Sequence, residues 1–152
     1  MKPAIIALIS LLTLRSYSGE LFSTVTANAA LGANSDSGNT VYALMVSTPI
    51  SESISLGLIG ANDGGRWVAG AATVNLGKEW LLTDKLGVNA NIGSGMGVDL
   101  FTHRPTAYSF FDVGGIYHVS RNLSVGVSGV VANVADRSGV DILGAASVSW
   151  KF

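Results

Sequence analysis

The stretch VSRNLSVGVSGVV, residues 119–131, decides the fold class because it joins a polar turn to an alternating segment. From Leu123 onward, branched apolar residues alternate with serine, glycine and other small residues. A period of two is typical of a β-strand with two different faces, and helical spacing fits this stretch no better. Similar alternation occurs at residues 54–58, 68–76 and 86–93, with Val68 expected on the same apolar face as Val74 and Leu76. The sequence therefore predicts an all-β protein.

The turn that opens this stretch recurs twice earlier in the chain. Each copy has an apolar residue, Ser or Thr, a charged residue, a polar residue, and then the start of a strand. The three copies are Ile50–Leu56, Leu82–Val88 and Val119–Val125. The Ser or Thr of each copy can bond the turn backbone. Glycine-rich polar turns of a second kind lie at residues 32–38, 62–65 and 135–139, and the repeated turns are found between them. Two alternating kinds of turn predict an up-and-down meander with two different ends.

Counting the segments between turns predicts eight strands. They are expected at residues 20–31, 39–48, 52–61, 66–80, 85–96, 106–119, 122–134 and 140–152. A transmembrane strand needs about 9–11 residues, and eight strands form a small membrane barrel. The alternative is a soluble β-sandwich or lipocalin-like ligand-binding barrel, whose outward faces should carry Lys, Glu and Arg. The outward faces here carry Val, Leu and Ile, which favours an eight-stranded antiparallel transmembrane β-barrel.

Composition points to the same class. Hydrophobic residues make up 48% of the 152 residues, charged residues only 12%, and the mean hydropathy is +0.44. A soluble domain usually carries about 25% charged residues. The net charge is −1 and no basic run is present, so nucleic acid is not an expected partner. The absence of cysteine excludes disulfides, thiol chemistry and cysteine metal ligands.

The first residues predict a signal peptide. Lys2 precedes an apolar run at residues 4–14, which is too short to span a membrane as a helix. Small residues before Gly19 suit cleavage, so we expect a signal peptide at 1–18 and an outer-membrane barrel at 19–152. A buried N-terminal helix is the alternative. A later cut after Ala29 would remove the first strand and leave seven.

Aromatic residues fall near the predicted strand ends. Near the end with the repeated turns lie Phe22, Trp80, Tyr117, Trp150 and Phe152, and toward the other end lie Tyr42, Trp67, Phe101, Tyr108, Phe110 and Phe111. Aromatic belts around an aliphatic band are expected where strands cross a membrane. Strand parity places Trp67, Tyr108 and Phe110 on the inner face.

The C-terminus carries a more specific resemblance. The chain ends GAASVSWKF, with Val148, Trp150 and Phe152 on one face. This ending resembles the last strand of bacterial outer-membrane β-barrel proteins, and the repeated turns resemble those of small eight-stranded members. These members are the attachment-invasion type and the transmembrane domain of outer-membrane protein A. The resemblance implies a bacterial outer-membrane location and lipids, including lipopolysaccharide, as surroundings. It also implies that Phe152, Trp150 and Val148 signal to the barrel-assembly machinery.

The sequence departs from that family in its interior and its loops. Small family barrels hold clusters of charged residues inside. In this sequence, strand parity predicts only two ionisable side chains that point inward, Asp112 and, at a strand end, His118. The loops are also short where adhesive relatives have long ones. A reduced or phage-encoded member would fit both departures.

Three places carry candidate chemistry. His118 and Ser120 resemble the His-x-Ser pair of lipid A deacylases, but they lie at a turn on the wrong side of the membrane, and no Glu follows position 79. The expected longest outward connection, residues 97–105, carries Asp99, Phe101, His103 and Arg104, which could meet lipopolysaccharide phosphate or a partner protein. Asp112 is a lumen carboxylate that needs hydrogen-bond donors.

The predicted function is a non-enzymatic integral outer-membrane barrel with a structural or surface-interaction role. No catalytic residue, cofactor or metal is expected, because Asp99 and His103 are too sparse for a metal site. The alternatives are a small pore, which side chains in an eight-stranded lumen disfavour, and a lipid-modifying enzyme. The extracellular partner is not indicated by the residues.

Overall fold

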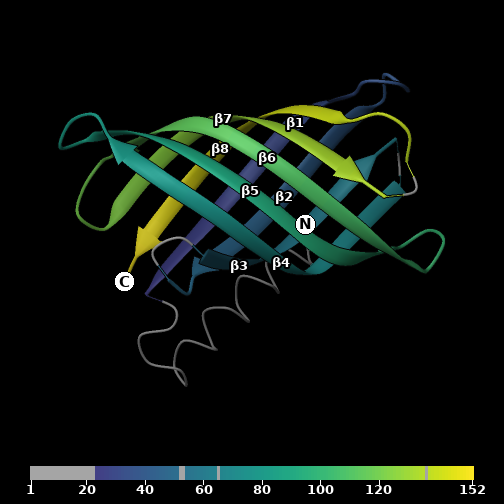
Figure 1. Cartoon of the computed structure of the whole chain (residues 1–152), viewed down its shortest axis with the longest axis horizontal. Helices are drawn as coiled ribbons and strands as arrows, with labels where there is room; N and C mark the ends of the chain where they lie inside the picture. Colours follow the sequence, from purple (N-terminus) through teal and green to yellow (C-terminus); the bar gives the residue numbers. More distant parts are fainter. Residues whose placement is uncertain (1–22, 52–53, 65, 136) are drawn as a thin grey trace.

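The computed structural model describes residues 23–152 except 52–53, 65 and 136, so the predicted signal peptide lies outside the described residues. The described chain folds as a closed barrel of eight antiparallel strands, each paired with its neighbours in sequence (Figure 1). The strands are β1 (Thr24–Asn34), β2 (Thr40–Pro49), β3 (Ile54–Asp63), β4 (Arg66–Leu81), β5 (Leu86–Asp99), β6 (Arg104–His118), β7 (Leu123–Val134) and β8 (Asp141–Lys151). The predicted eight-stranded meander is confirmed.

Among the described residues, no helix has the length and apolarity needed to cross a membrane.

The last strand closes the barrel on the first. Thr24 of β1 pairs with Lys151 of β8, and the ladder continues to Asn34 and Asp141. The Phe152 N–H extends it by donating to the Ser23 carbonyl oxygen at 2.8 Å. Closure pairs the two edges that an open sheet would leave exposed, which hydrocarbon surroundings require. The predicted pairing of the last strand with the first is confirmed, although Phe22 lies outside the described residues.

The three repeated turns share one hydrogen-bond pattern, and we call the end of the barrel that carries them the turn end. Ser51, Thr83 and Ser120 each accept, through the side-chain oxygen, the N–H three residues later, at 3.1, 3.0 and 3.1 Å. A backbone bond also closes each turn, as from the Leu82 N–H to the Leu86 carbonyl oxygen at 2.8 Å. The sequence pattern therefore predicted a real structural repeat.

At the opposite end, which we call the loop end, the strands β1, β3, β5 and β6 run further than expected. β5 continues to Asp99 and β6 begins at Arg104, so their connection is residues 100–103. The prediction that residues 97–105 form the longest outward connection is wrong, because residues 97 and 98 pair with Thr106 and Pro105 of β6. The connection between β7 and β8, residues 135–140, is longer.

A bulge in β4 changes which residues face inward. The register between β4 and β5 shifts between Gly70 and Ala72, so strand parity reverses there. Val68 is consequently buried inside the barrel, while Val74 and Leu76 are exposed on its outer face. The prediction that these three residues share one face is wrong for Val68.

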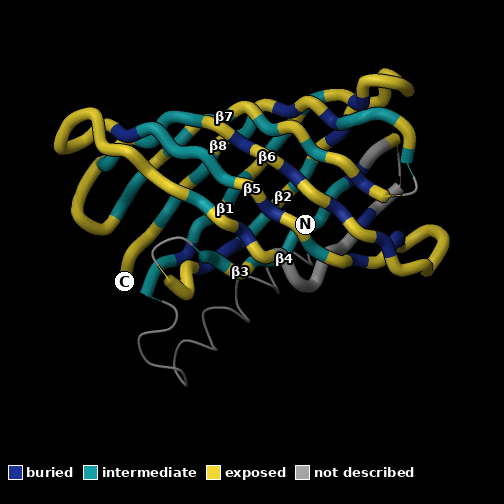
Figure 2. The backbone as a smooth tube through the Cα atoms, in the orientation of Figure 1, coloured by how far each residue is buried: buried dark blue, intermediate teal, exposed yellow. Residues whose placement is uncertain are grey.

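The interior is packed mainly toward the loop end. Val68, Tyr108, Phe110 and Val134 form a buried apolar cluster there, and Met45, Ile59, Val130 and Ala132 pack against it. Lumen residues nearer the turn end, such as Ser124 and Ser149, are only half-buried (Figure 2). The barrel is therefore closed by side chains in its loop-end half and more open in its turn-end half.

Candidate functional site

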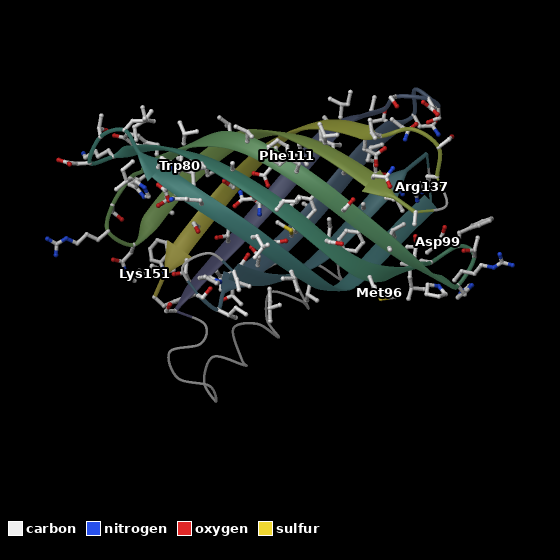
Figure 3. The ribbon with its side chains drawn as sticks, in the orientation of Figure 1. Trp80, Met96, Asp99, Phe111, Arg137 and Lys151 are labelled. Atoms are coloured by element: carbon white, nitrogen blue, oxygen red, sulfur yellow. The ribbon has the colours of Figure 1, made fainter. Side chains whose placement is uncertain are left out.

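The outer face of the barrel is an apolar surface. Large hydrophobic side chains are exposed on every strand from β1 to β8, and the exposed fraction of Val127 reaches 69%. Trp80 and Lys151 lie at the turn end, Met96 and Asp99 at the loop end, and Phe111 between them (Figure 3). Exposed apolar surface on this scale marks an interaction with lipid or with another apolar surface.

Aromatic side chains frame the turn end of this surface. Trp80, Tyr117, Trp150 and Phe152 are exposed there, and the Lys78 ammonium lies 5.7 Å from the centre of the Trp80 ring. Rings at such a boundary can bury their apolar part while a polar edge or a neighbouring cation meets water. Tyr42 and Phe101 are exposed nearer the loop end, and Tyr108 and Phe110 are buried inside the barrel as strand parity predicted. The side chain of Trp67 lies outside the described part of the structure.

The three C-terminal residues predicted to be an assembly signal share the outer face. Val148, Trp150 and Phe152 are all exposed, while the neighbouring Ser147 and Ser149 line the lumen. Trp150 pairs with Val25 of β1 and with Leu123 of β7, so it sits at the barrel closure. The predicted outward orientation of this segment is observed, and its contact with lipid and its role in assembly stay predictions.

The four residues predicted as a surface-interaction loop differ in their exposure and in their structural role. The Asp99 side chain is buried, and its Oδ1 accepts the N–H groups of Phe101 and Thr102 at 2.8 and 3.1 Å. His103 adopts a positive φ of 56° and donates its N–H to the Asp99 carbonyl oxygen. Asp99 thus shapes the turn, whereas Phe101, His103 and Arg104 are the exposed members. Phe101 has 75% of its surface exposed.

Asp112 faces the lumen, as predicted, and it has donors. Its Oδ1 accepts the Asn91 and Asn89 amides at 2.9 and 3.5 Å. Gly77 on β4 provides space for this arrangement, since a Cβ there would lie 1.9 Å from the Asn91 side-chain oxygen. Since both amide nitrogens donate to Asp112, both asparagines turn their amide oxygens away from it. The lumen carboxylate is therefore held in an amide network.

The barrel interior holds more ionisable residues than strand alternation predicted. Glu79 shares the inward parity of Gly77 and lines the lumen cavity. Asp141 also lines it near the loop end, where its Oδ1 accepts the Asn34 amide at 2.8 Å. With the buried Asp99 they show that the prediction of an interior with only Asp112 and His118 is wrong. All three lie near strand ends, where too few alternating residues follow to indicate which face a side chain is on.

A second polar cluster occupies the mouth of the lumen at the turn end. His118 Nδ1 is 2.8 Å from Ser124 Oγ, and His118 Nε2 is 2.7 Å from Glu79 Oε1. Glu79 reaches His118 by crossing Gly87 of β5, where a Cβ would lie 2.5 Å from its carboxylate oxygen. Ser120, the expected partner of His118, instead holds the turn through the Leu123 N–H. The absence of a Glu after position 79 therefore does not leave His118 without a carboxylate, because Glu79 itself reaches it from β4.

A lumen cavity of about 390 Å³ connects these two clusters. Its walls are rich in hydroxyl and amide groups, including Thr26, Asn28, Ser147 and Asn75, and aromatic rings of Tyr108 and Phe110 lie at its loop-end side. Within the described part of the chain, no group of three or more His, Asp or Glu residues is placed to hold a metal ion.

The comparisons with known proteins agree on architecture. A de novo designed transmembrane β-barrel superposes with a TM-score of 0.57 at 13% identity, over 86% of this chain and 97% of the design. The chain has the fold of a small transmembrane β-barrel. Neisserial surface protein A aligns with a TM-score of 0.58 at 10% identity, over 85% of this chain and 95% of that one.

A natural barrel domain from another bacterium is also similar. The N-terminal β-barrel domain of Pseudomonas aeruginosa OprF aligns with a TM-score of 0.52 at 10% identity, over 86% of this chain and 98% of the domain. No protein-family model matches the sequence, and no curated protein matches it either. The expected resemblance to small eight-stranded outer-membrane barrels is therefore confirmed at the level of fold.

Proposed function

We propose that this chain is an integral protein of the bacterial outer membrane, with a structural or surface-interaction role carried by its outer face and its loops. The observation that carries the proposal is the continuous apolar outer face of a closed barrel, with aromatic rings exposed toward its ends. Such a face is costly in water and is stabilised in hydrocarbon. The fold shared with natural and designed transmembrane barrels supports the same conclusion.

The packing of the lumen favours this role over transport. Tyr108 and Phe110 lie across the loop-end half of the lumen with Val68 and Val134, and all four are buried. An eight-stranded barrel has an interior just wide enough for its side chains to fill it. A solute entering from the turn end would therefore meet an apolar cluster before it reached the loops.

The loop end is the part that would meet the cell exterior. Phe101 next to His103 and Arg104 combines an exposed ring with an imidazole and a guanidinium, which suits the boundary between acyl chains and the phosphates of lipopolysaccharide. We propose these three residues as the contact surface, with Asp99 holding their turn. During biogenesis, the exposed Val148, Trp150 and Phe152 would be read by the barrel-assembly machinery.

Cell fractionation combined with a gel-shift assay tests the proposal. The full chain is expressed in a Gram-negative host, and the outer-membrane fraction is run on a denaturing gel with and without heating. We expect the protein in that fraction, with an unheated band that migrates differently from the heated one. Recovery in the soluble fraction, with no effect of heating, would contradict it. Conductance in planar bilayers then separates the structural role, which predicts none, from the pore alternative.

A further inference from the structure

The cluster at the turn end has the connectivity of a nucleophile, a base and an orienting carboxylate. Ser124, His118 and Glu79 come from three different strands, β7, β6 and β4, and meet at the lumen mouth through bonds of 2.8 and 2.7 Å. Serine hydrolases on unrelated folds share this arrangement, which is recognised by geometry and roles and not by sequence position. The proposed structural role of the barrel makes no use of it.

The hydrogen bonds determine where the proton lies on the imidazole. An ionised Glu79 carboxylate can only accept, so His118 Nε2 donates to it. In the neutral ring, Nδ1 then carries the lone pair and accepts the Ser124 hydroxyl proton at 2.8 Å. Nδ1 is therefore set to act as the base, and the carboxylate is placed to stabilise the imidazolium that forms. His118 and Glu79 are about one third exposed, so the cluster is in contact with the lumen mouth.

The surroundings of Ser124 offer space and a hydrogen-bond donor. Ser124, Ser149 and Thr26 all line the cavity of about 390 Å³, a volume in the range of small-molecule sites. Ser149 is the register partner of Ser124 and is hydrogen-bonded to Thr26. When Thr26 is the donor in this bond, the Ser149 hydroxyl hydrogen is free and can be donated to an oxygen that becomes negative beside Ser124.

We propose that Ser124 is a reactive nucleophile toward short-chain carboxylic esters that enter from the turn end. Ser124 Oγ attacks the acyl carbon while its proton moves to His118 Nδ1. The bond between the acyl carbon and the alcohol oxygen breaks, and the proton passes to the departing alkoxide. Water then cleaves the acyl-serine by the same route, which releases the carboxylic acid and restores the hydroxyl. This activity goes beyond the proposed function and lies at the opposite end of the barrel from its loops.

Active-site labelling tests the proposal on the folded full chain in detergent micelles. A fluorophosphonate probe should phosphonylate Ser124, as located by mass spectrometry of the peptides. Labelling should be absent in Ser124→Ala and unchanged in Ser128→Ala, which removes a lumen serine from the same face of β7. Because a general base contributes about a hundredfold or more, His118→Asn should slow labelling by at least that factor. No labelling of the folded wild type, or labelling unaffected by His118→Asn, would overturn the proposal.

A cysteine version gives a second readout and isolates the positioning role of Glu79. The chain has no cysteine, so Ser124→Cys introduces the only thiol. Its alkylation by iodoacetamide should be at least about tenfold faster than that of Ser128→Cys, because the adjacent imidazole favours the thiolate. Adding Glu79→Gln should remove this advantage without altering the heat-dependent gel shift. Equal alkylation rates at positions 124 and 128 would refute the proposed roles of Ser124, His118 and Glu79. So would a faster rate at position 124 that persists after Glu79→Gln, and both results are informative even if His118→Asn fails to fold.

Discussion

Substitution of Gly93 by alanine tests whether the lumen is packed as tightly as the structure indicates. Gly93 lies on β5, opposite Phe110 of β6, and faces the interior. A Cβ at this position would lie 2.3 Å from Phe110 Cζ and 2.5 Å from Asn75 Oδ1. Both contacts are far inside van der Waals separation, so the ring or the amide has to move.

The cost follows from what those groups touch. Phe110 is buried in the apolar cluster with Val68 and Tyr108, and Asn75 is buried with its amide bonded to Ser55 Oγ at 3.1 Å. Neither can shift without disturbing its neighbours, and overpacking of a close-packed interior costs about 1–3 kcal/mol. We therefore expect Gly93→Ala to lower the free energy of unfolding by about that amount.

Gly129 provides the matched control. It lies on β7 on the outer face, and a Cβ there would meet nothing within 4 Å. Gly129→Ala should be neutral or raise stability by up to about 1 kcal/mol, because alanine loses less backbone entropy on folding. Urea unfolding of barrels refolded into lipid vesicles, followed by tryptophan fluorescence and gel shift, measures both variants. Equal unfolding midpoints for Gly93→Ala and Gly129→Ala would refute the description of the lumen.

Three further predictions address the outer face, the turns and the C-terminus. Val127→Arg places a cation on the exposed outer face and should lower the free energy of unfolding in vesicles by about 2–4 kcal/mol. Thr102→Arg, in a loop, should not lower it, and urea unfolding in vesicles compares the two variants. Thr83→Val removes the hydrogen bond to the Leu86 N–H and should cost about 0.5–1.5 kcal/mol, while Thr83→Ser keeps it, and equal stability of the two would contradict this reading. Deleting Phe152 should reduce the fraction assembled in cells far more than the unfolding midpoint of barrels already folded in vitro. Normal assembly in cells after this deletion combined with Trp150→Ala would show that the C-terminal resemblance is accidental.

The strand order was predictable because each strand carries its own signal. Residues such as Val125 and Val127 mark one face of β7 and Ser124 and Ser128 the other, and all four keep that division in the structure. The repeated turns were predictable for a similar local reason, since Ser120 bonds a backbone N–H only three residues away. Local patterns of this kind need no knowledge of the neighbouring strands.

The inversion of Val68 was not predictable from the alternation. The bulge that reverses its orientation falls in the segment from Val68 to Ala72, whose intervening residues are all alanine or glycine. Small residues fit either face of a barrel, so they give no sign of the point at which parity changes. A bulge is revealed by the partner strands, and the ladders that pair β4 with β3 and with β5 both shift register there.

The mouth cluster was missed for a different reason. His118 and Glu79 are on β6 and β4, which are separated by β5. Their contact depends on Gly87, which carries no side chain to block Glu79. The sequence alone provides no reason to connect a glycine at a strand start with a carboxylate and a histidine on two other strands.

The central claim is that the apolar face of this barrel lies in lipid while the serine-rich face lines the lumen. Single cysteines placed along β7 in the cysteine-free chain, each carrying an environment-sensitive fluorophore, test it in vesicles made with brominated acyl chains. Bromine should quench probes at positions 125, 127 and 131 strongly and probes at positions 124 and 128 weakly, so that quenching alternates with strand parity. Uniform quenching along β7, or no quenching at position 127, would contradict the account.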